Sequence, residues 1–248
     1  ASISNYAYPH ALQWQFDIPS RMKVNDVKYK LDGFSLKLIA VAAMTIDHIS
    51  AVFFPSEIWM RLIGRLTMPI MAYLVAEGYH YTRSVKKYLL RLLVFAFISQ
   101  VPYMLAFGTA NLNVMFTLAI SVLLLAIEAS IMSNALRLLL TFSLLLFSVF
   151  CDWSLFGVLF VYVFYRYRVN FRRQALAFCV VVMLQLAVSA AISIPGGRYD
   201  YFVNAGTIAA LPLLSLYNQR RGRDVRYFFY IYYPAHLAVL ALIRYLVT

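Results

Sequence analysis

Charged residues are scarce in this chain. Only 13% of its 248 residues are Asp, Glu, Lys or Arg, whereas 63% are hydrophobic, and the mean hydropathy is +0.74. In soluble domains, about half of the residues are apolar and about a quarter are charged. The composition therefore excludes an ordinary soluble domain.

Residues that ligate metals are also few and scattered. The two cysteines, Cys151 and Cys179, lie in apolar stretches, and the four histidines fall on different segments. No spacing typical of a metal site recurs, so we expect none. Residues 1–30 lack the apolar core of a signal peptide. In a chain this apolar, a net charge of +12 indicates cytoplasmic loops and contacts with anionic lipid, so we expect membrane lipid and no nucleic acid as a partner.

The sequence contains long apolar runs. A helix that spans a membrane needs about 20 predominantly apolar residues. Such runs lie at about 33–54, 61–82, 88–107, 114–132, 136–151, 154–168, 174–194, 202–218 and 227–247, of which the fifth and sixth are short enough to be tilted, shallow or partly re-entrant. We expect an all-α, polytopic integral membrane bundle of about nine transmembrane helices (33–248), preceded by a cytoplasmic N-terminal arm (1–32).

Basic residues alternate between the connecting segments. One side of the predicted bundle carries 17 of the 22 lysines and arginines, from Arg21–Lys37, Arg83–Lys87, Arg137, Arg166–Arg173 and Arg220–Arg226. Loops rich in Lys and Arg stay in the cytoplasm. The pattern predicts a cytoplasmic N-terminus, an outward C-terminus and residence in a bacterial cytoplasmic (inner) membrane.

Several polar residues interrupt the apolar runs. Ionisable side chains inside a membrane are costly and usually face a cavity where they function. They form an outer group, an inner group and a histidine between the two, namely Asp47, His48 and Arg65; Glu77 and Arg91; and His236. This distribution predicts a polar path through the bundle.

The outer group suggests a division of roles. Asp47 and His48 are adjacent on a helix and point about 100° apart, so the carboxylate does not orient the imidazole. We expect Asp47 to pair with Arg65 of the next helix, which leaves His48 for proton transfer or nucleophilic attack. The alternative is a structural Asp–Arg pair beside a packed, hydrogen-bonded histidine.

Five motifs, in order over about residues 33–248, resemble the TraX family. They are LKLIAVAAMTIDHI, GRLTMPIMAYLVAEGYHYT, KYLLRLLVFAFISQVPY, NLNVMFTL and FYIYYPAHLAVL. The resemblance implies a membrane acetyltransferase that uses acetyl-CoA, because the named member of the family acetylates the N-terminus of a conjugative pilin. It also implies kinship with wider membrane acyltransferases, in which an intramembrane histidine is catalytic. That role falls here on His48, with His236 as the alternative.

The resemblance also implies the donor, the contacts and the acceptor of the site, and no metal is expected in it. Acetyl-CoA would keep its nucleotide at the basic inner face, where its contacts would come from Lys37, Glu77, Arg83, Lys86, Lys87 and Arg91. His48 would deprotonate the acceptor or briefly carry the acetyl group, and Arg65, Asn111 or Asn113 would stabilise the oxyanion. The acceptor would be an amine or hydroxyl at the outer side, on a pilin N-terminus or an envelope glycan or lipid.

Two other functions remain compatible with the sequence. Intramembrane Asp, His and Arg residues also build the paths of small-solute or ion transporters. Transporters often contain paired repeats with Gly- or Pro-broken helices, and no such repeat is visible here. A non-catalytic assembly factor would leave the buried charges without a role.

Overall fold

A computed structural model describes residues 30–196, 200–224 and 226–247, and helices account for its secondary structure apart from two isolated β-bridges. The fold is all-α, as predicted. The helices are α1 (Gly33–Phe53), α2 (Ile58–Gly64), α3 (Thr67–Tyr81), α4 (Val85–Phe107), α5 (Val114–Glu128), α6 (Asn134–Ser148), α7 (Ser154–Arg166), α8 (Phe171–Ser193), η1 (Ile194–Gly196), η2 (Asp200–Ala209), α9 (Ala210–Ser215) and α10 (Arg226–Val247). The predicted N-terminal arm lies outside the described residues except for its last three.

Five helical segments are long and apolar enough to cross a membrane. They are α1, the α2–α3 pair, α4, α8 and α10, and the other apolar helices are shorter. The chain is therefore a helical membrane protein. Each of the nine predicted apolar runs contains helix within the described residues, but a topology with nine crossings stays a prediction.

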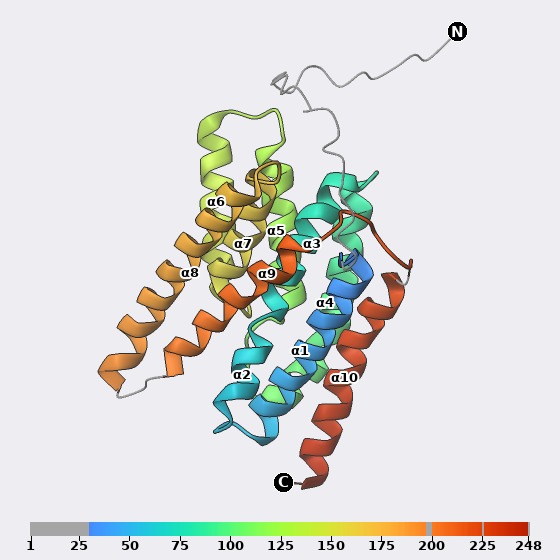
Figure 1. Cartoon of the computed structure of the whole chain (residues 1–248), viewed down its shortest axis with the longest axis vertical. Coiled ribbons are helices and arrows are strands. Elements are labelled where there is room, and N and C mark those ends of the chain that lie inside the picture. Colours follow the sequence, from blue (N-terminus) through green and yellow to red (C-terminus); the bar gives the residue numbers. More distant parts are fainter. Residues whose placement is uncertain (1–29, 197–199, 225, 248) are drawn as a thin grey trace.

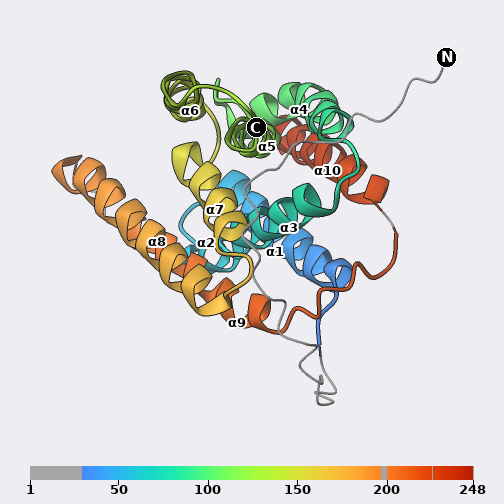
Figure 2. The same ribbon diagram turned by 90° about the horizontal axis from the view of Figure 1, so that it is seen from above.

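Successive segments run in alternate directions along the long axis of the bundle (Figure 1). The end at which α1, α4, α8 and α10 begin carries most of the described arginines and lysines of the connecting segments, and we call it the basic end. The opposite end, where these helices finish, is called the far end. Seen along the bundle, α8 lies at its margin and α1 and α3 lie inside it (Figure 2).

The second predicted span is broken in the structure. Helix α2 ends at Gly64 and α3 begins at Thr67, with Pro69 in its first turn. Proline has no backbone N–H and cannot donate to the carbonyl of the residue four positions before it, here Arg65. The break places Arg65 at the junction of two helices, near the far end.

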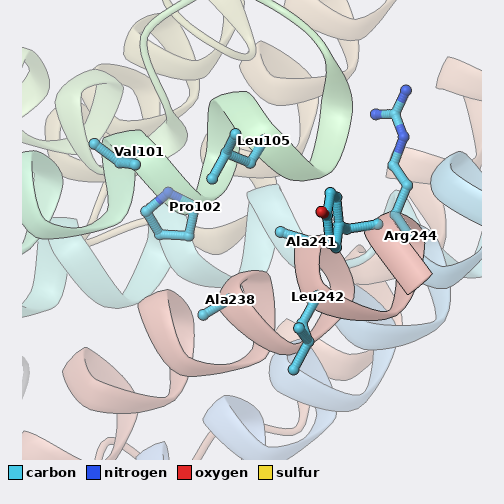
Figure 3. Close-up of a pocket in the computed structure, with 8 residues that line it drawn as sticks. Val101, Pro102, Leu105, Ala238, Ala241, Leu242 and Arg244 are labelled. Atoms are coloured by element: carbon cyan, nitrogen blue, oxygen red, sulfur yellow. The ribbon is translucent and has the colours of Figure 1, made fainter.

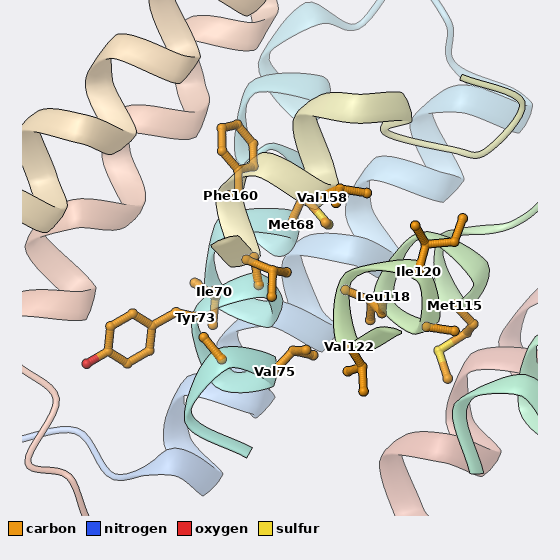
Figure 4. Packing of buried hydrophobic residues seen from close by; sticks show 14 of the residues in the cluster. Met68, Ile70, Tyr73, Val75, Met115, Leu118, Ile120, Val122, Val158 and Phe160 are labelled. Carbon is orange, nitrogen blue, oxygen red and sulfur yellow. The ribbon is translucent and has the colours of Figure 1, made fainter. Parts of the chain in front are cut away.

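The buried core lies where α3, α5 and α7 pack together (Figure 4). Met68 and Ile70 of α3, Leu118 of α5, and Val158 and Phe160 of α7 are all buried. Their apolar side chains fill the space between the three helices and form a rigid wall. This wall supports one side of the cavity described below.

The start of α1 is fixed by a cap and by the segment before α10. The Asp32 carboxylate accepts hydrogen bonds from the backbone N–H and the hydroxyl of Ser35, and these bonds lower the pKa of Asp32 below its usual value. The backbone N–H of Gly33 donates to the carbonyl of Arg220 at 2.8 Å. The basic segment that begins at Arg220 is thereby held beside the first turn of α1.

Candidate active site

A cavity of about 220 Å³, lined by both charged and apolar side chains, lies between α1, α2, α3, α4, α5 and α10. Helix α1 lines it with Ala40, Met44, His48 and Ala51, which share one helical face because they recur every three or four residues. Its ionisable lining residues are Asp47, His48, Arg61, Arg65, Asp152, Tyr103 and Tyr233. The cavity therefore brings together the outer group that the sequence predicts and adds residues that it does not.

The two candidate histidines are in direct contact. Nδ1 of His48 on α1 lies 2.8 Å from Nε2 of His236 on α10, and the two rings are nearly parallel (16° between their planes) with centroids 5.0 Å apart. Nδ1 of His236 lies 3.0 Å from the backbone carbonyl oxygen of Tyr232. Each histidine is only 9% exposed. From the sequence, the two histidines are alternative catalytic residues, whereas in the structure they are hydrogen-bonded to each other.

Aromatic rings enclose the pair. The edge of the His48 ring meets Phe107 of α4, with centroids 5.0 Å apart, and Tyr233 lies 6.5 Å away. His236 also stacks on Tyr232, whose hydroxyl is 2.7 Å from the hydroxyl of Thr45. These contacts pack both rings inside the bundle.

Asp47 has a different ion-pair partner from the one predicted. Its carboxylate lies 2.9 Å from the guanidinium of Arg61, and Arg61 also donates to the backbone carbonyl of Asp47. Arg65 interacts electrostatically with Asp47, and its guanidinium lies over the Trp153 ring, 5.1 Å from the centroid. Arg61 is the first residue of the predicted second span. The helix that begins at Ile58 carries it to the cavity wall.

Asp152 is a cavity residue that sequence reasoning missed. Its backbone N–H donates to the carbonyl of Leu112 at 2.7 Å, and its backbone carbonyl accepts from the Thr117 hydroxyl. Its carboxylate accepts from the N–H of Trp153 and interacts electrostatically with Arg65. An aspartate between two apolar runs resembles an ordinary turn residue, so no sequence signal distinguishes it.

The cavity reaches toward the basic end at Phe229. Lys37 of α1 lies over the Phe229 ring, with its Nζ 5.3 Å from the centroid. Lys37 and His48 are eleven residues apart, which is close to three full turns of α-helix, so they share a face about 16 Å apart. One stripe of α1 thus carries a cation beside the cavity residue Phe229, toward the basic end, and an imidazole in the cavity itself.

The predicted inner group is not part of this cavity. The Glu77 carboxylate accepts from the guanidinium of Arg168, which also donates to the Tyr81 hydroxyl at 2.8 Å. Arg91 lies over the Tyr88 ring instead, 5.7 Å from the centroid. The structure gives Glu77 an ion pair between α3 and the segment after α7, outside the cavity lining.

The other predicted contacts also lie outside the cavity lining. Arg83, Lys86 and Lys87 are exposed at the basic end, where α3 connects to α4. Asn113 caps α5 and donates from its amide to the Ala96 carbonyl and to Gln100. Asn111 is exposed, and its carbonyl accepts from Gln100. The structure therefore uses both asparagines to hold the start of α5 against α4.

A second, larger cavity of about 610 Å³ lies between the far ends of α4 and α10 (Figure 3). Its lining is mostly apolar, from Val101, Pro102 and Leu105 on one helix and Leu242 on the other. Arg244 borders it and donates to the Ala106 carbonyl at 2.8 Å. The histidine pair lies outside this cavity, which has the character of a lipid-facing groove.

Comparison with known proteins gives the family. The family described as TraX protein matches residues 33–244. The probable fimbrial assembly protein FimC, serogroup H1, of Dichelobacter nodosus is 34% identical over 228 residues, covering 84% of this chain and 93% of that protein. An uncharacterized protein of Rickettsia prowazekii (strain Madrid E) is 38% identical over 66 residues, covering 27% of this chain and 25% of that protein, and no solved structure matches. The chain belongs to the TraX family.

Proposed function

We propose that this protein is a membrane-embedded acetyltransferase. It takes an acetyl group from acetyl-CoA at the basic end and transfers it to an amine or hydroxyl at the far end. In this proposal the basic end faces the cytoplasm of a bacterium, the protein resides in the inner membrane, and the N-terminus is cytoplasmic.

One observation carries the proposal. A buried imidazole, His48, faces a cavity whose charged lining groups are two carboxylates and two guanidiniums, Asp47, Asp152, Arg61 and Arg65. An imidazole is a base suited to neutral pH, and guanidiniums in a site of low polarity can stabilise a negative oxygen that develops during acyl transfer. A transporter would need a polar route across the bundle, whereas Glu77 and Arg168 engage each other away from the cavity.

The stripe on α1 fits the donor. Acetyl-CoA is too charged to enter lipid, so its phosphates would stay at the basic end near Lys37 and the segment that begins at Arg220. The pantetheine arm is a chain of about a dozen bonds, roughly 15 Å when extended like four residues of polypeptide. This length is close to the separation of Lys37 and His48 along the helix. The thioester would then reach the imidazole while the nucleotide stays at the membrane surface.

The transfer step follows from this placement. The acceptor nitrogen or oxygen bonds to the acetyl carbonyl carbon as the His48 imidazole takes the acceptor proton. The carbonyl oxygen becomes negative beside Arg65, and it re-forms the C=O bond as the bond from carbon to sulfur breaks. The departing thiolate then receives the proton, which gives CoA and the acetylated acceptor. An acetyl-histidine intermediate would place the same ring in the role of carrier.

The acceptor is proposed from the comparisons. A relative that covers most of this chain is named a probable fimbrial assembly protein. A pilin subunit, whose N-terminal amine could be presented at the far end, is therefore our first candidate acceptor. An envelope glycan or lipid with a free hydroxyl is the alternative.

The experiment uses the full-length protein in lipid nanodiscs with [¹⁴C]acetyl-CoA and a membrane extract of the host. We expect label to move to one class of acceptor, which mass spectrometry of the labelled band or lipid fraction identifies. His48→Ala should abolish transfer, and His80→Gln, on an exposed histidine at the end of α3, is the matched control. Equal labelling with wild-type, His48→Ala and empty nanodiscs would refute the proposed activity.

A further inference from the structure

We propose that His236 is a positioning residue that holds His48 in the one tautomer whose Nε2 lone pair faces the cavity. The inference rests on the proposed function, because it states which atom of the site reacts. His48 on α1 and His236 on α10 then act together, rather than as alternative catalytic residues.

The proton positions follow from the partners of each nitrogen. A backbone carbonyl oxygen can only accept, so Nδ1 of His236 must carry the hydrogen that it gives to Tyr232. In the neutral ring, Nε2 of His236 is then an acceptor, and Nδ1 of His48 must donate to it across 2.8 Å. The remaining nitrogen of His48, Nε2, consequently carries a lone pair. It points away from His236, and His48 lines the cavity whereas His236 does not.

His236 accepts the hydrogen bond from Nδ1–H of His48, a role that a carboxylate often has beside a catalytic imidazole. A buried carboxylate needs a cation or several donors to stay charged, whereas a neutral acceptor carries no such cost. Asp47, the carboxylate adjacent in sequence, is turned to Arg61. When Nε2 of His48 takes a proton, its Nδ1–H still has an acceptor, and the new charge is stabilised within the pair.

The surroundings show which other groups act on His48. Arg61 of α2 and His236 of α10 interact with it electrostatically, and Tyr233 lies 6.5 Å away between ring centroids. Phe107 of α4 covers its edge. Of the neighbours that the structure describes around Nδ1, His236 alone is a hydrogen-bond partner. Removing that acceptor therefore leaves the tautomer of His48 unspecified.

The test measures the reactivity of His48 without needing an acceptor. Diethyl pyrocarbonate acylates neutral imidazole nitrogens, and mass spectrometry locates the modified residue. The full-length protein is used in nanodiscs with His10→Gln and His80→Gln in the background. His236→Leu keeps an apolar side chain but removes the acceptor, whereas His236→Gln restores an amide oxygen that can accept from Nδ1 and an amide N–H that can donate to Tyr232.

We expect His236→Leu to slow modification of His48 at least about tenfold, since a catalytic imidazole in the wrong tautomer loses most of its activity. His236→Gln should recover most of the rate. In the acetyl-transfer assay, His236→Leu should lower kcat by a similar factor and leave the KM for acetyl-CoA unchanged. If His236→Leu does not fold, His236→Met takes its place, with the same expectation.

Two results would overturn the inference. Modification at the wild-type rate in His236→Leu would show that the acceptor does not matter. An equal loss in His236→Leu and His236→Gln would show that the shape of the ring matters rather than its hydrogen bond. A protein that acetylates nothing would end the proposed function, while the reactivity of His48 would still report on the pair.

Discussion

The α-carbon of Gly64 lies directly against the side chain of Asp47. A methyl group at this position would overlap the Asp47 carboxylate and its β-carbon. The close approach lets α2 pack on α1 so that Arg61, one turn before Gly64, reaches Asp47. Glycine is required here for space, since its backbone adopts ordinary helical angles.

Gly64→Ala should therefore disturb the site without adding any charge. We expect the new methyl group to push α2 away from α1, lengthen the contact between Asp47 and Arg61, and lower acetyl transfer at least about tenfold. Gly78→Ala is the matched control. Its added methyl would meet only the hydroxyl end of the Tyr88 side chain, which can shift. Initial rates with labelled acetyl-CoA compare the two, and equal activities would mean that the close approach is dispensable.

The Asp47–Arg61 pair should show coupling in a double-mutant cycle. Asp47→Ala or Arg61→Ala strands the partner charge in a half-buried site, at a cost of about 3 kcal/mol. The double variant should be less destabilised than the sum of the single changes. Thermal unfolding in detergent measures this. A cycle between Asp47 and Arg65 is the comparison, and stronger coupling there would restore the pairing predicted from sequence.

Donor binding should distinguish Lys37 from the exposed lysines. Lys37→Gln should raise the KM for acetyl-CoA more than it lowers kcat, because Lys37 lies over the cavity residue Phe229, on the side of the basic end. Lys86→Gln with Lys87→Gln should raise KM less, and that effect should fade as salt rises, because exposed charges are screened.

Arg172→Gln with Arg173→Gln, also exposed at the basic end, controls for a loss of net charge. An unchanged KM in Lys37→Gln, with a large rise in the double lysine variant, would move the phosphates to the connection between α3 and α4.

The orientation of the bundle is testable by labelling. In a background of Cys151→Ser and Cys179→Ser, we expect Arg172→Cys to resist a membrane-impermeant maleimide in intact cells. Ser56→Cys, in the exposed connection between α1 and α2 at the far end, should react with it. The opposite pattern would invert the topology, and reaction of both would refute an odd number of crossings between these positions.

Much of the fold follows from the apolar runs of the sequence. The all-α class and the positions of the helices were predicted because a chain without water around its backbone must satisfy its hydrogen bonds within helices. The second run, 61–82, was predicted as one span, and the structure breaks it between Gly64 and Thr67. The consequence of this break, a short α2 that brings Arg61 to the cavity, depends on the packing of α2 on α1.

The candidate site was only partly accessible from the sequence. Asp47, His48 and Arg65 were grouped by their similar depth, and the structure places them in one cavity. The contact between His48 and His236 joins residues 188 positions apart, which helical periodicity alone does not indicate. Asn113 caps α5 in the structure, and the sequence does not distinguish this role from a substrate contact because both need the same side chain.

The placement of the two histidines also determines when the site can form during biosynthesis. Helix α1 is the first of the described helices to emerge from the ribosome, and α10 is the last. His48 consequently waits, without its partner, while the intervening helices enter the membrane. A chain interrupted before α10 would keep the cavity residues of α1 and α2 but lack the acceptor for Nδ1. Under the proposed function, acyl transfer should therefore begin only after the described helices have all been inserted.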